Sequence, residues 1–498
     1  MDLNISWHAI AATVVLYYLT LILYRLSFHP LSQFPGPRLA AISRWYEAYY
    51  DIAELHKKYG PIIRISPYEL HVNDPAFYDS LYRMDGRWYK YSWTYDAFGA
   101  KNSTVFCSDH NVHKIRRSAI GPFFSKARKA RITARQDVIS RNVEKLCQRI
   151  SDLAGTDFNL GAAVSAFTRD TANEFIVGKR YEELDLEDFG IALSLASQGA
   201  GPFWRITKHM RWFGPAMRAL PVPWAMRIAD EGTKAFFDVP SQSEKDTRDT
   251  LAAATSSSSA LMLREDEKPS KSKSTTMIHE IAYSDLPPAE KAFERVFEEV
   301  ATVTGAAYET TATTLRLIIY HIFTDDEILR TLRKEIETLC GRSKVTLKDL
   351  EQFPYLTAVI KEGLRLSPGI GSRAARVTDK EIVYETWRIP AGTPVGMTTL
   401  LMHTDENVFR DPMRFHPGRW IEDEGRRRRS FAPFSRGTRM CLGMHLAWAE
   451  MYLLLSALVQ RFNFTFKDCT GADFMFERDN FNIGTKAGCN LVACSRSV

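Results

Sequence analysis

The chain has 498 residues, of which 45% are hydrophobic and 25% are charged, and this composition is typical of a globular protein. Its formal net charge of +6 is small for this length, and no cluster of Lys and Arg is interleaved with stacking aromatic residues, which excludes nucleic acid as a partner. The seven cysteines follow no C-x-x-C or other metal-ligand spacing, which excludes a zinc site and favours reduced thiols.

The first element in chain order is an apolar helix. Residues 3–24 contain no Asp, Glu, Lys or Arg, and a helix of this length spans about 33 Å, enough to cross a bilayer. Asp2 precedes this run and Arg25 follows it, a charge bias that leaves the C-terminal side in the cytosol. We predict a transmembrane signal anchor over residues 1–27. The alternative is a cleaved signal peptide, but the run lacks a basic n-region.

A short proline-rich hinge follows over residues 28–39, because closely spaced prolines stiffen the chain and stop helices. From residue 40 to 498 the pattern predicts one domain, mainly α with a small β portion. Strand-like runs occur at 62–65 with 69–72, and at 382–385 through 394–395. The serine- and lysine-rich stretch at about 240–285 buries little apolar surface, so we expect a mobile surface loop there.

The longest predicted helix begins after Pro287-Pro288 and ends near Phe323. An apolar stripe at helical spacing runs along it for about 35 residues, or about 50 Å, so it must cross the whole domain. Small residues at 305–307 leave room for a flat ligand, and Glu309 with Thr310 predict a carboxylate–hydroxyl relay for protons. The alternative for this segment is an ordinary core helix rich in Thr and Ala.

Two further motifs follow the long helix. Glu362 and Arg365 lie three residues apart among apolar neighbours, which predicts a buried ion pair.

Near the C-terminus, Cys441 lies in a loop between Gly437 and Gly443, with Arg439 two residues before it. Backbone N–H groups in such a turn keep a thiolate ionised, and Arg439 offers a fork of donors to a carboxylate. A thiolate beside a carboxylate-bearing planar cofactor is typical of a haem-iron site, and the alternative is an ordinary buried cysteine.

The segment 434–443, FSRGTRMCLG, matches every fixed position of F-x-x-G-x-R-x-C-x-G, the haem-binding signature of the cytochrome P-450 family. The resemblance covers about 440 residues, because the hinge, the acid–threonine helix, E-x-x-R and a later arginine motif with Arg419 come in family order. It implies the cytochrome P-450 fold, with the long helix crossing the haem. Ala307 and Gly418 depart from the family pattern, where glycine and glutamate are usual.

The resemblance implies haem b (iron protoporphyrin IX) as cofactor and Cys441 as the axial ligand of its iron. It also places Ala306 beside bound dioxygen and Glu309 with Thr310 in proton delivery. Arg376 is preferred over Arg373 as a propionate ligand. The residues implied to bind the cofactor are His113, Arg117, Ala306, Arg376, Phe434, Arg439, Cys441 and Gly443.

The implied activity is that of a haem-thiolate monooxygenase that hydroxylates or epoxidises a hydrophobic small molecule with O2. No flavin or nicotinamide fingerprint is present, so electrons from NADPH must arrive through a separate NADPH–cytochrome P-450 reductase, for which Arg426–Arg429 is a candidate docking patch. The anchor implies a single-pass protein of the endoplasmic reticulum membrane with a cytosolic catalytic domain. The alternatives are a haem-thiolate isomerase or dehydratase that needs no reductase, and a non-enzymatic haem-binding protein.

The sequences of residues 109–125 and 305–315 are similar to those of filamentous-fungal cytochrome P-450 proteins that act on secondary metabolites, including the trichodiene-oxygenase-like group. This similarity implies a substrate of terpenoid or polyketide/alkaloid type. Aromatic residues in the variable segments predict a hydrophobic pocket. The candidate wall residues are Trp93, Tyr95, Phe98, Phe203, Trp204 and Phe481.

Overall fold

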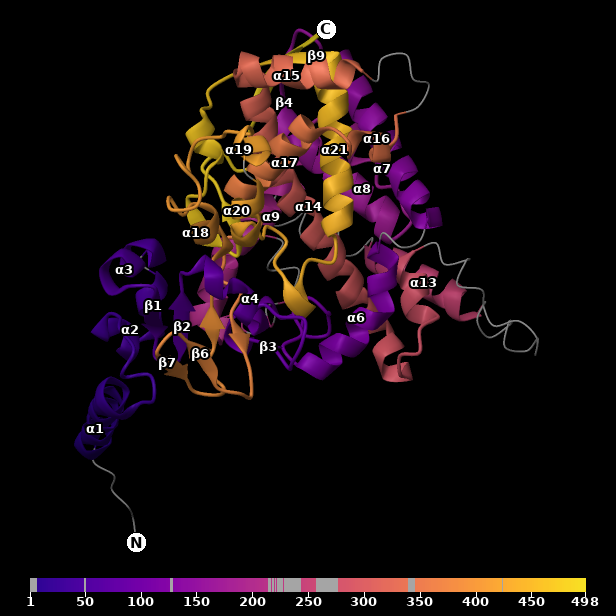
Figure 1. The fold of residues 1–498 in the computed structure, drawn as a ribbon. Helices are drawn as coiled ribbons and strands as arrows, with labels where there is room; N and C mark the ends of the chain where they lie inside the picture. The colour runs from indigo at the N-terminus through magenta and orange to yellow at the C-terminus, as the bar shows by residue number, and fades with distance from the viewer. Residues whose placement is uncertain are drawn as a thin grey trace.

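The computed structural model describes residues 7–498 apart from 49–50, 126–128, 214–215, 217–218, 220, 222–226, 228–242, 257–275, 339–344 and 423. Helices make up most of the body, and a smaller β-rich part lies beside the N-terminal helices (Figure 1). The prediction of a mainly α protein with a small β portion is confirmed.

The N-terminal half contains these helices: α1 (Trp7–Leu23), α2 (Arg38–Ile42), α3 (Ile52–Tyr59), α4 (Tyr78–Leu81), α5 (Ser92–Tyr95), α6 (His110–Phe124), α7 (Lys129–Asp152), α8 (Leu160–Ile176) and α9 (Ile191–His209). The later helices are α13 (Met277–Ala282), α14 (Phe293–Thr324), α15 (Asp326–Glu337), α16 (Leu347–Leu350), α17 (Pro354–Leu366), α18 (Thr399–His403), α19 (Arg419–Glu422), α20 (Glu424–Arg427) and α21 (Met444–Arg461). α14 runs through the middle of the helical body, and α8, α13, α15, α17 and α21 contact it (Figure 1).

The strands form four small sheets. The largest has the order β1-β2-β8-β5-β3, from β1 (Ile62–Ser66), β2 (Glu69–Val72), β8 (Val395–Gly396), β5 (Arg376–Val377) and β3 (Tyr89–Lys90). The others are β4-β12-β9, β10-β11 and β6-β7, from β4 (Asp157–Asn159), β12 (Val492–Ser497), β9 (Phe462–Phe466), β10 (Arg478–Asn480), β11 (Asn482–Gly484), β6 (Ile382–Tyr384) and β7 (Trp387–Ile389). In the largest sheet Lys90 pairs with Arg376, so two cationic residues lie side by side at its edge.

The core is built around α14, against which α8, α17 and α21 pack. α8 is buried along almost its whole length, which its small residues at 161–163 permit by allowing neighbouring backbone to approach. α14 is 32 residues long and begins at Phe293, later than predicted, because Pro288–Lys291 forms a separate 3₁₀ turn. Its end agrees with the predicted boundary, and Asp325 caps the next helix through the N–H groups of Glu327 and Ile328.

The predicted loop at 240–285 is partly helical in the structure. Residues 243–256 form a helix, and α13 lies in the same stretch, whereas 240–242 and 257–275 lie outside the described residues. Leu251 and Ala254 are buried, and the Tyr181 hydroxyl donates a hydrogen bond to Asp246 over 2.9 Å. Tertiary contacts of this kind are not visible in local composition, which is why the helix was not predicted.

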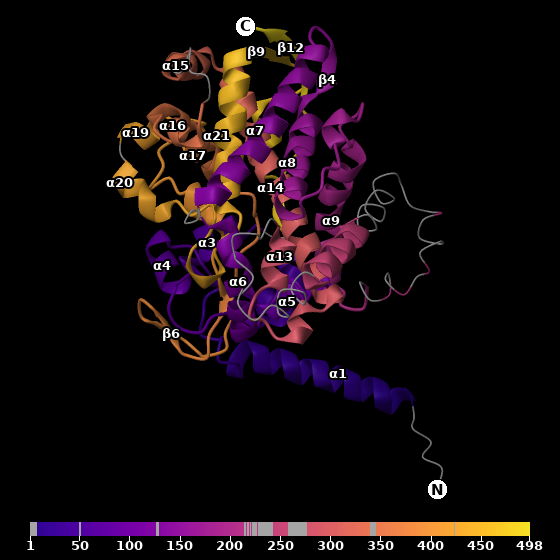
Figure 2. The same cartoon turned by 90° about the vertical axis from the view of Figure 1, so that its right-hand side faces the viewer.

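α1 projects from the body as a separate arm (Figure 2). Together with the π-helical turn Tyr24–Phe28 it forms a 22-residue, largely apolar run, in which an 18-residue window has a mean hydropathy of 1.8 and no buried residue. The run is long and apolar enough to cross a bilayer, which is consistent with a membrane anchor. Its C-terminal end is fixed to the domain: Arg25 donates hydrogen bonds to the Ile42 carbonyl and the Tyr68 hydroxyl, and Arg64 donates to the Arg25 carbonyl.

Two truncations test the anchor. Removal of residues 1–23 is expected to weaken membrane association while Arg25 and its contacts stay in place. Removal of residues 1–27 should weaken membrane association equally but also lower the stability of the domain by about 1–2 kcal/mol, because the Arg25 hydrogen bonds are lost. Sedimentation after carbonate washing and thermal unfolding measure the two effects. Full-length protein that stays soluble, or an N-terminus cleaved near residue 27, would contradict the anchor.

Candidate active site

The cysteine loop runs from Phe431 to Gly443 and needs one glycine for its shape. Gly437 has φ +75°, and a Cβ there would lie 2.5 Å from the Arg83 carbonyl oxygen. The adjacent Thr438 N–H donates to the same carbonyl over 3.1 Å, and the Cys441 N–H donates to the Phe434 carbonyl over 2.9 Å. A side chain at 437 would therefore push the loop away from the segment that holds it.

The Cys441 sulfur lies at the start of α21. Burial raises the pKa of its thiol, while hydrogen bonds from the backbone of Gly443 and Met444 and the charge of Arg117 lower it. These are the donors that a thiolate needs. Gly443 has an ordinary φ of −85°, so its contribution is its N–H group and its lack of a side chain beside the sulfur. Although protein atoms crowd around the thiol and raise its pKa, the Cys441 residue keeps solvent-accessible surface at which a ligand could bind.

A group of cationic side chains interacts near this loop, and we call it the cation cluster: Lys90, His113, Arg117, Arg376 and Arg439. Burial and the neighbouring positive charges hold the pKa of Lys90 well below its usual range and lower that of His113 to about 2. The same causes lower the pKa of Arg439 to about 10. Within the described residues no salt bridge joins any of the five to a carboxylate. A pKa of about 2 leaves His113 uncharged at neutral pH. The positive charges crowded among the other members call for an anion.

The members of the cation cluster are held mainly by backbone oxygens. Arg439 donates to the carbonyls of Cys107, Ser108 and Asp109 at 2.7–3.1 Å, and its buried Nε has no protein partner. Lys90 donates to the Val105 carbonyl over 2.5 Å. Lys90 was not predicted, because no motif marks it and only the pairing of β3 with β5 brings it to Arg376. Arg373 lies elsewhere, in buried ion pairs with Glu47 and Glu69.

These features together fit haem b. The donor set offers one thiol with two N–H groups at its sulfur, and the cation cluster supplies positive charge for two anionic propionates. On α14, Gly305 and Ala306 are exposed although neighbouring positions of this helix are buried, so small residues leave space beside it. A Cβ at Gly305 would meet nothing within 4 Å. Cys441 would hold the iron, and the cation cluster would hold the propionates.

Glu309 and Thr310 are adjacent on α14 but make different contacts. The Thr310 hydroxyl donates to the Ala306 carbonyl over 2.8 Å, and Thr310 packs against Gly369. The Glu309 carboxylate is buried and accepts a hydrogen bond from Arg316 over 2.9 Å. Arg316 also donates to Thr313 and Ser165. The carboxylate and the hydroxyl do not bond each other directly, so a proton passing between them needs water or a change of side-chain rotamer.

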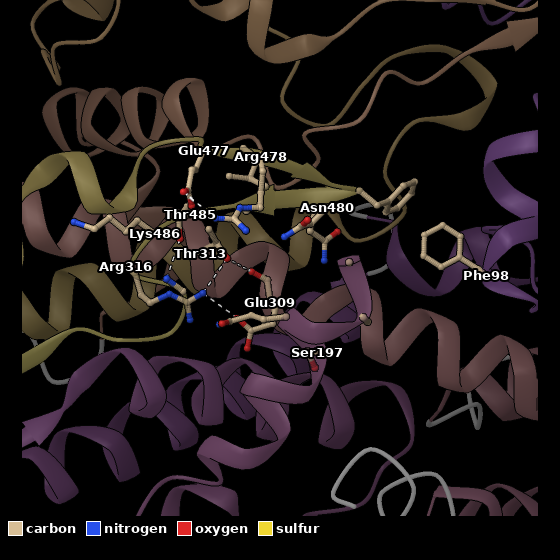
Figure 3. Close-up of a pocket in the computed structure, with 18 residues that line it drawn as sticks. Phe98, Ser197, Glu309, Thr313, Arg316, Glu477, Arg478, Asn480, Thr485 and Lys486 are labelled. Atoms are coloured by element: carbon tan, nitrogen blue, oxygen red, sulfur yellow. Dashed lines mark hydrogen bonds and ion pairs between the residues drawn. The ribbon is translucent and has the colours of Figure 1, made fainter. Parts of the chain in front are cut away.

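A cavity of about 330 Å³ adjoins Glu309 (Figure 3). Its lining includes Arg316 and Thr313 from α14, Gln198 and Gly201 from α9, and residues of the β10–β11 hairpin. Four buried polar atoms of lining residues lack a hydrogen-bond partner in the described part of the protein: Nε2 of Gln198, Oε1 of Glu309, Nε of Arg316 and Oδ1 of Asn480. Such atoms are normally bonded to water, and the volume holds about ten water molecules at ~30 Å³ each. The cavity therefore has room for water beside Glu309.

Aromatic rings from three segments meet close to this cavity. Phe98 stacks on Phe106 at 4.3 Å between ring centroids and lies 4.7 Å from Phe481, and Trp204 lies 5.5 Å from Phe481. Phe481 is at the tip of the β10–β11 hairpin with φ +70°, and its carbonyl accepts from the Gly371 N–H over 2.9 Å. Tyr95 joins this aromatic cluster.

Two of the predicted wall residues are outside the aromatic cluster. Trp93 contacts Arg44, Arg211 and His209, and Phe203 is partly exposed beside Phe213. Helical periodicity explains the difference at α9, because Phe203 and Trp204 are neighbours and point to different sides of the helix.

The buried ion pair is confirmed, with a third member. Arg365 and Glu362 are 2.8 Å apart with both side chains fully buried, and Arg419 contacts Glu362 at 3.1 Å. Other N–H groups of Arg365 and Arg419 donate hydrogen bonds to backbone carbonyls within residues 403–414. Trp420, which was not predicted, donates its indole N–H to Glu362 over 2.9 Å. Each charged group of this buried triad (Glu362, Arg365 and Arg419) has an oppositely charged partner, so the triad holds in place the segment that leads to the cysteine loop.

Comparisons with known proteins agree with this geometry. The cytochrome P450 family model matches residues 38–487. A cytochrome P450 monooxygenase, MO6277 of Ascocoryne sarcoides, is 35% identical over 490 residues, covering 94% of this chain and 93% of the relative. N-acetyltryptophan 6-hydroxylase ivoC of Emericella nidulans is 33% identical and covers 97% and 96%. The cytochrome P450 monooxygenase TRI4 of Fusarium sporotrichioides is 32% identical and covers 93% and 90%.

Among solved structures, retinoic acid bound cyanobacterial CYP120A1 superposes with a TM-score of 0.66 at 17% identity, covering 89% of this chain and 93% of that chain. A helical body around a cysteine loop, with a cation cluster for a dianionic cofactor, defines a haem-thiolate protein. The chain belongs to the cytochrome P450 family, and it is a cytochrome P450 monooxygenase.

Proposed function

We propose that this protein inserts one oxygen atom from O2 into a hydrophobic small molecule of fungal secondary metabolism, by hydroxylation or epoxidation. The observation that carries the proposal is the combination of the Cys441 site with Glu309 and Thr310 on α14, beside a wet cavity. A protein that only bound haem would need the first feature but not the second.

When bound, the haem supplies dioxygen activation and C–H oxidation. The chain's own residues set the conditions for that chemistry. The N–H groups at the Cys441 sulfur favour the thiolate, and the cation cluster neutralises the propionates. Oε1 of Glu309 makes no hydrogen bond to the protein among the described residues, although the Arg169 guanidinium lies 4.0 Å from it, so it is the carboxylate oxygen that can exchange protons with cavity water. Thr310 Oγ1 then carries the proton to the ligand side of α14.

The aromatic cluster supports a hydrophobic or aromatic substrate. Two relatives are named for an indole-containing substrate: N-acetyltryptophan 6-hydroxylase ivoC, and tryptophan 6-hydroxylase fscE of Fusarium equiseti, which is 33% identical over 487 residues. TRI4 of Trichoderma arundinaceum is 32% identical over 484 residues. The compound is therefore proposed only as a class, a hydrophobic secondary metabolite of terpenoid, polyketide or alkaloid type.

A haem-thiolate isomerase or dehydratase is the second candidate, since it would use the same cysteine site without a reductase. It has no need of protons delivered to dioxygen. The hydrogen-bonded Glu309 carboxylate and its cavity therefore favour the monooxygenase.

The proposed electron donor is a membrane-bound NADPH–cytochrome P-450 reductase, and the proposed location is the endoplasmic reticulum membrane, where α1 would hold both proteins on one surface. In the candidate docking patch, Arg428 and Arg429 are exposed. Arg427 instead donates a hydrogen bond to the Arg419 carbonyl. The Arg426 side chain is not among the side chains that the structure describes. The proposed basic face also takes in the Lys and Arg residues at 114, 116, 126, 128 and 129. Arg116 is buried in an ion pair with Glu290 and therefore does not contribute to this face. Lys114 is exposed.

Reconstitution with the reductase tests the proposed function. Purified protein is expected to consume NADPH and to place one atom of labelled O2 in the product when an aromatic or terpenoid substrate is supplied. The rate should fall with ionic strength, because the Debye length shrinks from about 10 Å at 0.1 M to about 3 Å at 1 M. Conversion of an oxygenated substrate without NADPH or reductase would support the isomerase instead.

The same assay tests the docking patch. An Arg428→Gln/Arg429→Gln double variant should be reduced more slowly at low salt and should lose most of the salt dependence. The matched control is Arg330→Gln/Lys334→Gln, which removes two exposed charges from α15 and should leave the reduction rate unchanged. Equal reduction rates and equal salt dependence in the two double variants would show that Arg428 and Arg429 are ordinary solvent-exposed charges and not part of a docking patch.

A further inference from the structure

A fully buried histidine links α17 to the cysteine loop. His403 ends α18 and is 0% exposed. One ring nitrogen, Nδ1, lies 3.0 Å from the Arg365 carbonyl oxygen, and the other, Nε2, accepts a hydrogen bond from the Ala432 N–H over 3.0 Å. Arg365 belongs to the buried triad, and Ala432 is the second residue of the cysteine loop. One side chain thus spans the two structures that determine where Cys441 lies.

The two partners fix the protonation of His403. The Arg365 carbonyl can only accept, so Nδ1 must carry the hydrogen. The Ala432 N–H can only donate, so Nε2 must keep its lone pair. The ring is therefore neutral in a single tautomer, and burial lowers its pKa to about 3 against the opposing hydrogen bond to Arg365. The charges nearest to it are Arg365 and Arg436, both positive, and they oppose protonation too.

The link continues through the loop to the cysteine. The Ala432 carbonyl accepts from the Ser435 N–H over 3.0 Å, and the Phe434 carbonyl accepts from the Cys441 N–H over 2.9 Å. Phe431, the first loop residue, stacks on the His403 ring with centroids 5.5 Å apart and contacts Trp420 at 4.7 Å. The start of the loop is therefore held by hydrogen bonds from one side and by ring packing from another. The position of the Cys441 sulfur depends on the position of this loop start.

We propose that His403 is a positioning residue for the iron ligand, which ties the start of the cysteine loop to α17 so that the Cys441 thiolate stays in place. The inference rests on the assignment of Cys441 as the haem ligand. Loss of the ring nitrogens leaves two buried backbone groups without partners. The loop can satisfy them only by moving, and its movement carries the sulfur away from the iron.

The test compares three variants by the Soret band of the ferrous–CO form, which is strongly red-shifted only while the thiolate ligates the iron. His403→Phe keeps a flat ring for Phe431 but makes neither hydrogen bond, whereas His403→Gln offers an amide N–H and an oxygen in their place. The control is His56→Phe, since His56 is another buried histidine with hydrogen bonds on both ring nitrogens, to Gly60 and His71. Thermal unfolding is measured for all three.

The red-shifted share of the band is expected to fall by half or more in His403→Phe and to be largely kept in His403→Gln. His56→Phe should lower the thermal midpoint but keep the full red-shifted band. A His403→Phe protein with the wild-type band would overturn the proposal. A wild-type protein that binds haem without any red-shifted band would instead overturn the Cys441 assignment.

A second measurement covers the case in which His403→Phe does not fold. In mild urea, the red-shifted form of His403→Gln should convert to the blue-shifted form about threefold faster than wild type or more, as expected for a weakened hydrogen bond. An unchanged conversion rate would overturn the proposal.

Discussion

Replacement of Cys441 by Ser or Ala is expected to abolish the strongly red-shifted Soret band of the ferrous–CO form and with it all oxygenation. Burial raises the pKa of this thiol, while the hydrogen bonds from Gly443 and Met444 and the charge of Arg117 oppose that rise. A bound iron would deprotonate the thiol outright. A hydroxyl has a far higher pKa than a thiol and cannot supply the same electron density to the iron. Absorption spectra of the reduced, CO-saturated protein measure the effect.

Another cysteine serves as the control for this change. Cys469→Ser alters a half-buried thiol outside the cysteine loop and should leave the red-shifted band intact. The cation cluster is unchanged in Cys441→Ala, so that variant should still take up haem, although more weakly. Survival of the red-shifted band in Cys441→Ala would show that another residue ligates the iron.

Replacement of Thr310 by Ala is expected to separate electron consumption from product formation. The proposed relay uses this hydroxyl, which donates a hydrogen bond to the Ala306 carbonyl over 2.8 Å. If Glu309 and Thr310 form the proposed relay, loss of the hydroxyl would interrupt proton delivery. NADPH oxidation should then continue while the electrons appear as hydrogen peroxide. A proton-transfer group of this kind contributes about 10²-fold or more, and product formation should fall accordingly. NADPH, peroxide and product are measured together.

Two controls isolate the hydroxyl. Thr310→Ser keeps the O–H group and should keep most of the coupling. Thr304→Val removes a hydroxyl with a similar hydrogen bond to the preceding turn, at a buried position of α14, and should leave the coupling unchanged. Wild-type coupling in Thr310→Ala would place proton delivery elsewhere, whereas Glu309→Gln should reproduce the loss if the carboxylate feeds the hydroxyl.

The sequence contained enough information to place the chain in its family and fold class. The spacing of Glu362 and Arg365 predicted a buried ion pair, and the structure confirms it together with the contact to Arg419. The apolar stripe of α14 predicted a helix long enough to cross the domain, and its C-terminal end agreed. These features depend on local periodicity and on motifs of fixed spacing, which are written directly in the chain. The roles of Cys441, Glu309 and Thr310 stay predictions that the experiments above test.

Other features arise only when distant segments meet. Lys90 joins the cation cluster because β3 pairs with β5, and His403 reaches the cysteine loop because α18 packs between α17 and that loop. Residues 243–256 were expected to be a loop, yet they form a helix whose Leu251 and Ala254 find a buried surface elsewhere in the chain. Local sequence determined the motifs and their chemistry. Tertiary structure decided their partners, because burial and long-range hydrogen bonds depend on neighbours that sequence distance does not reveal.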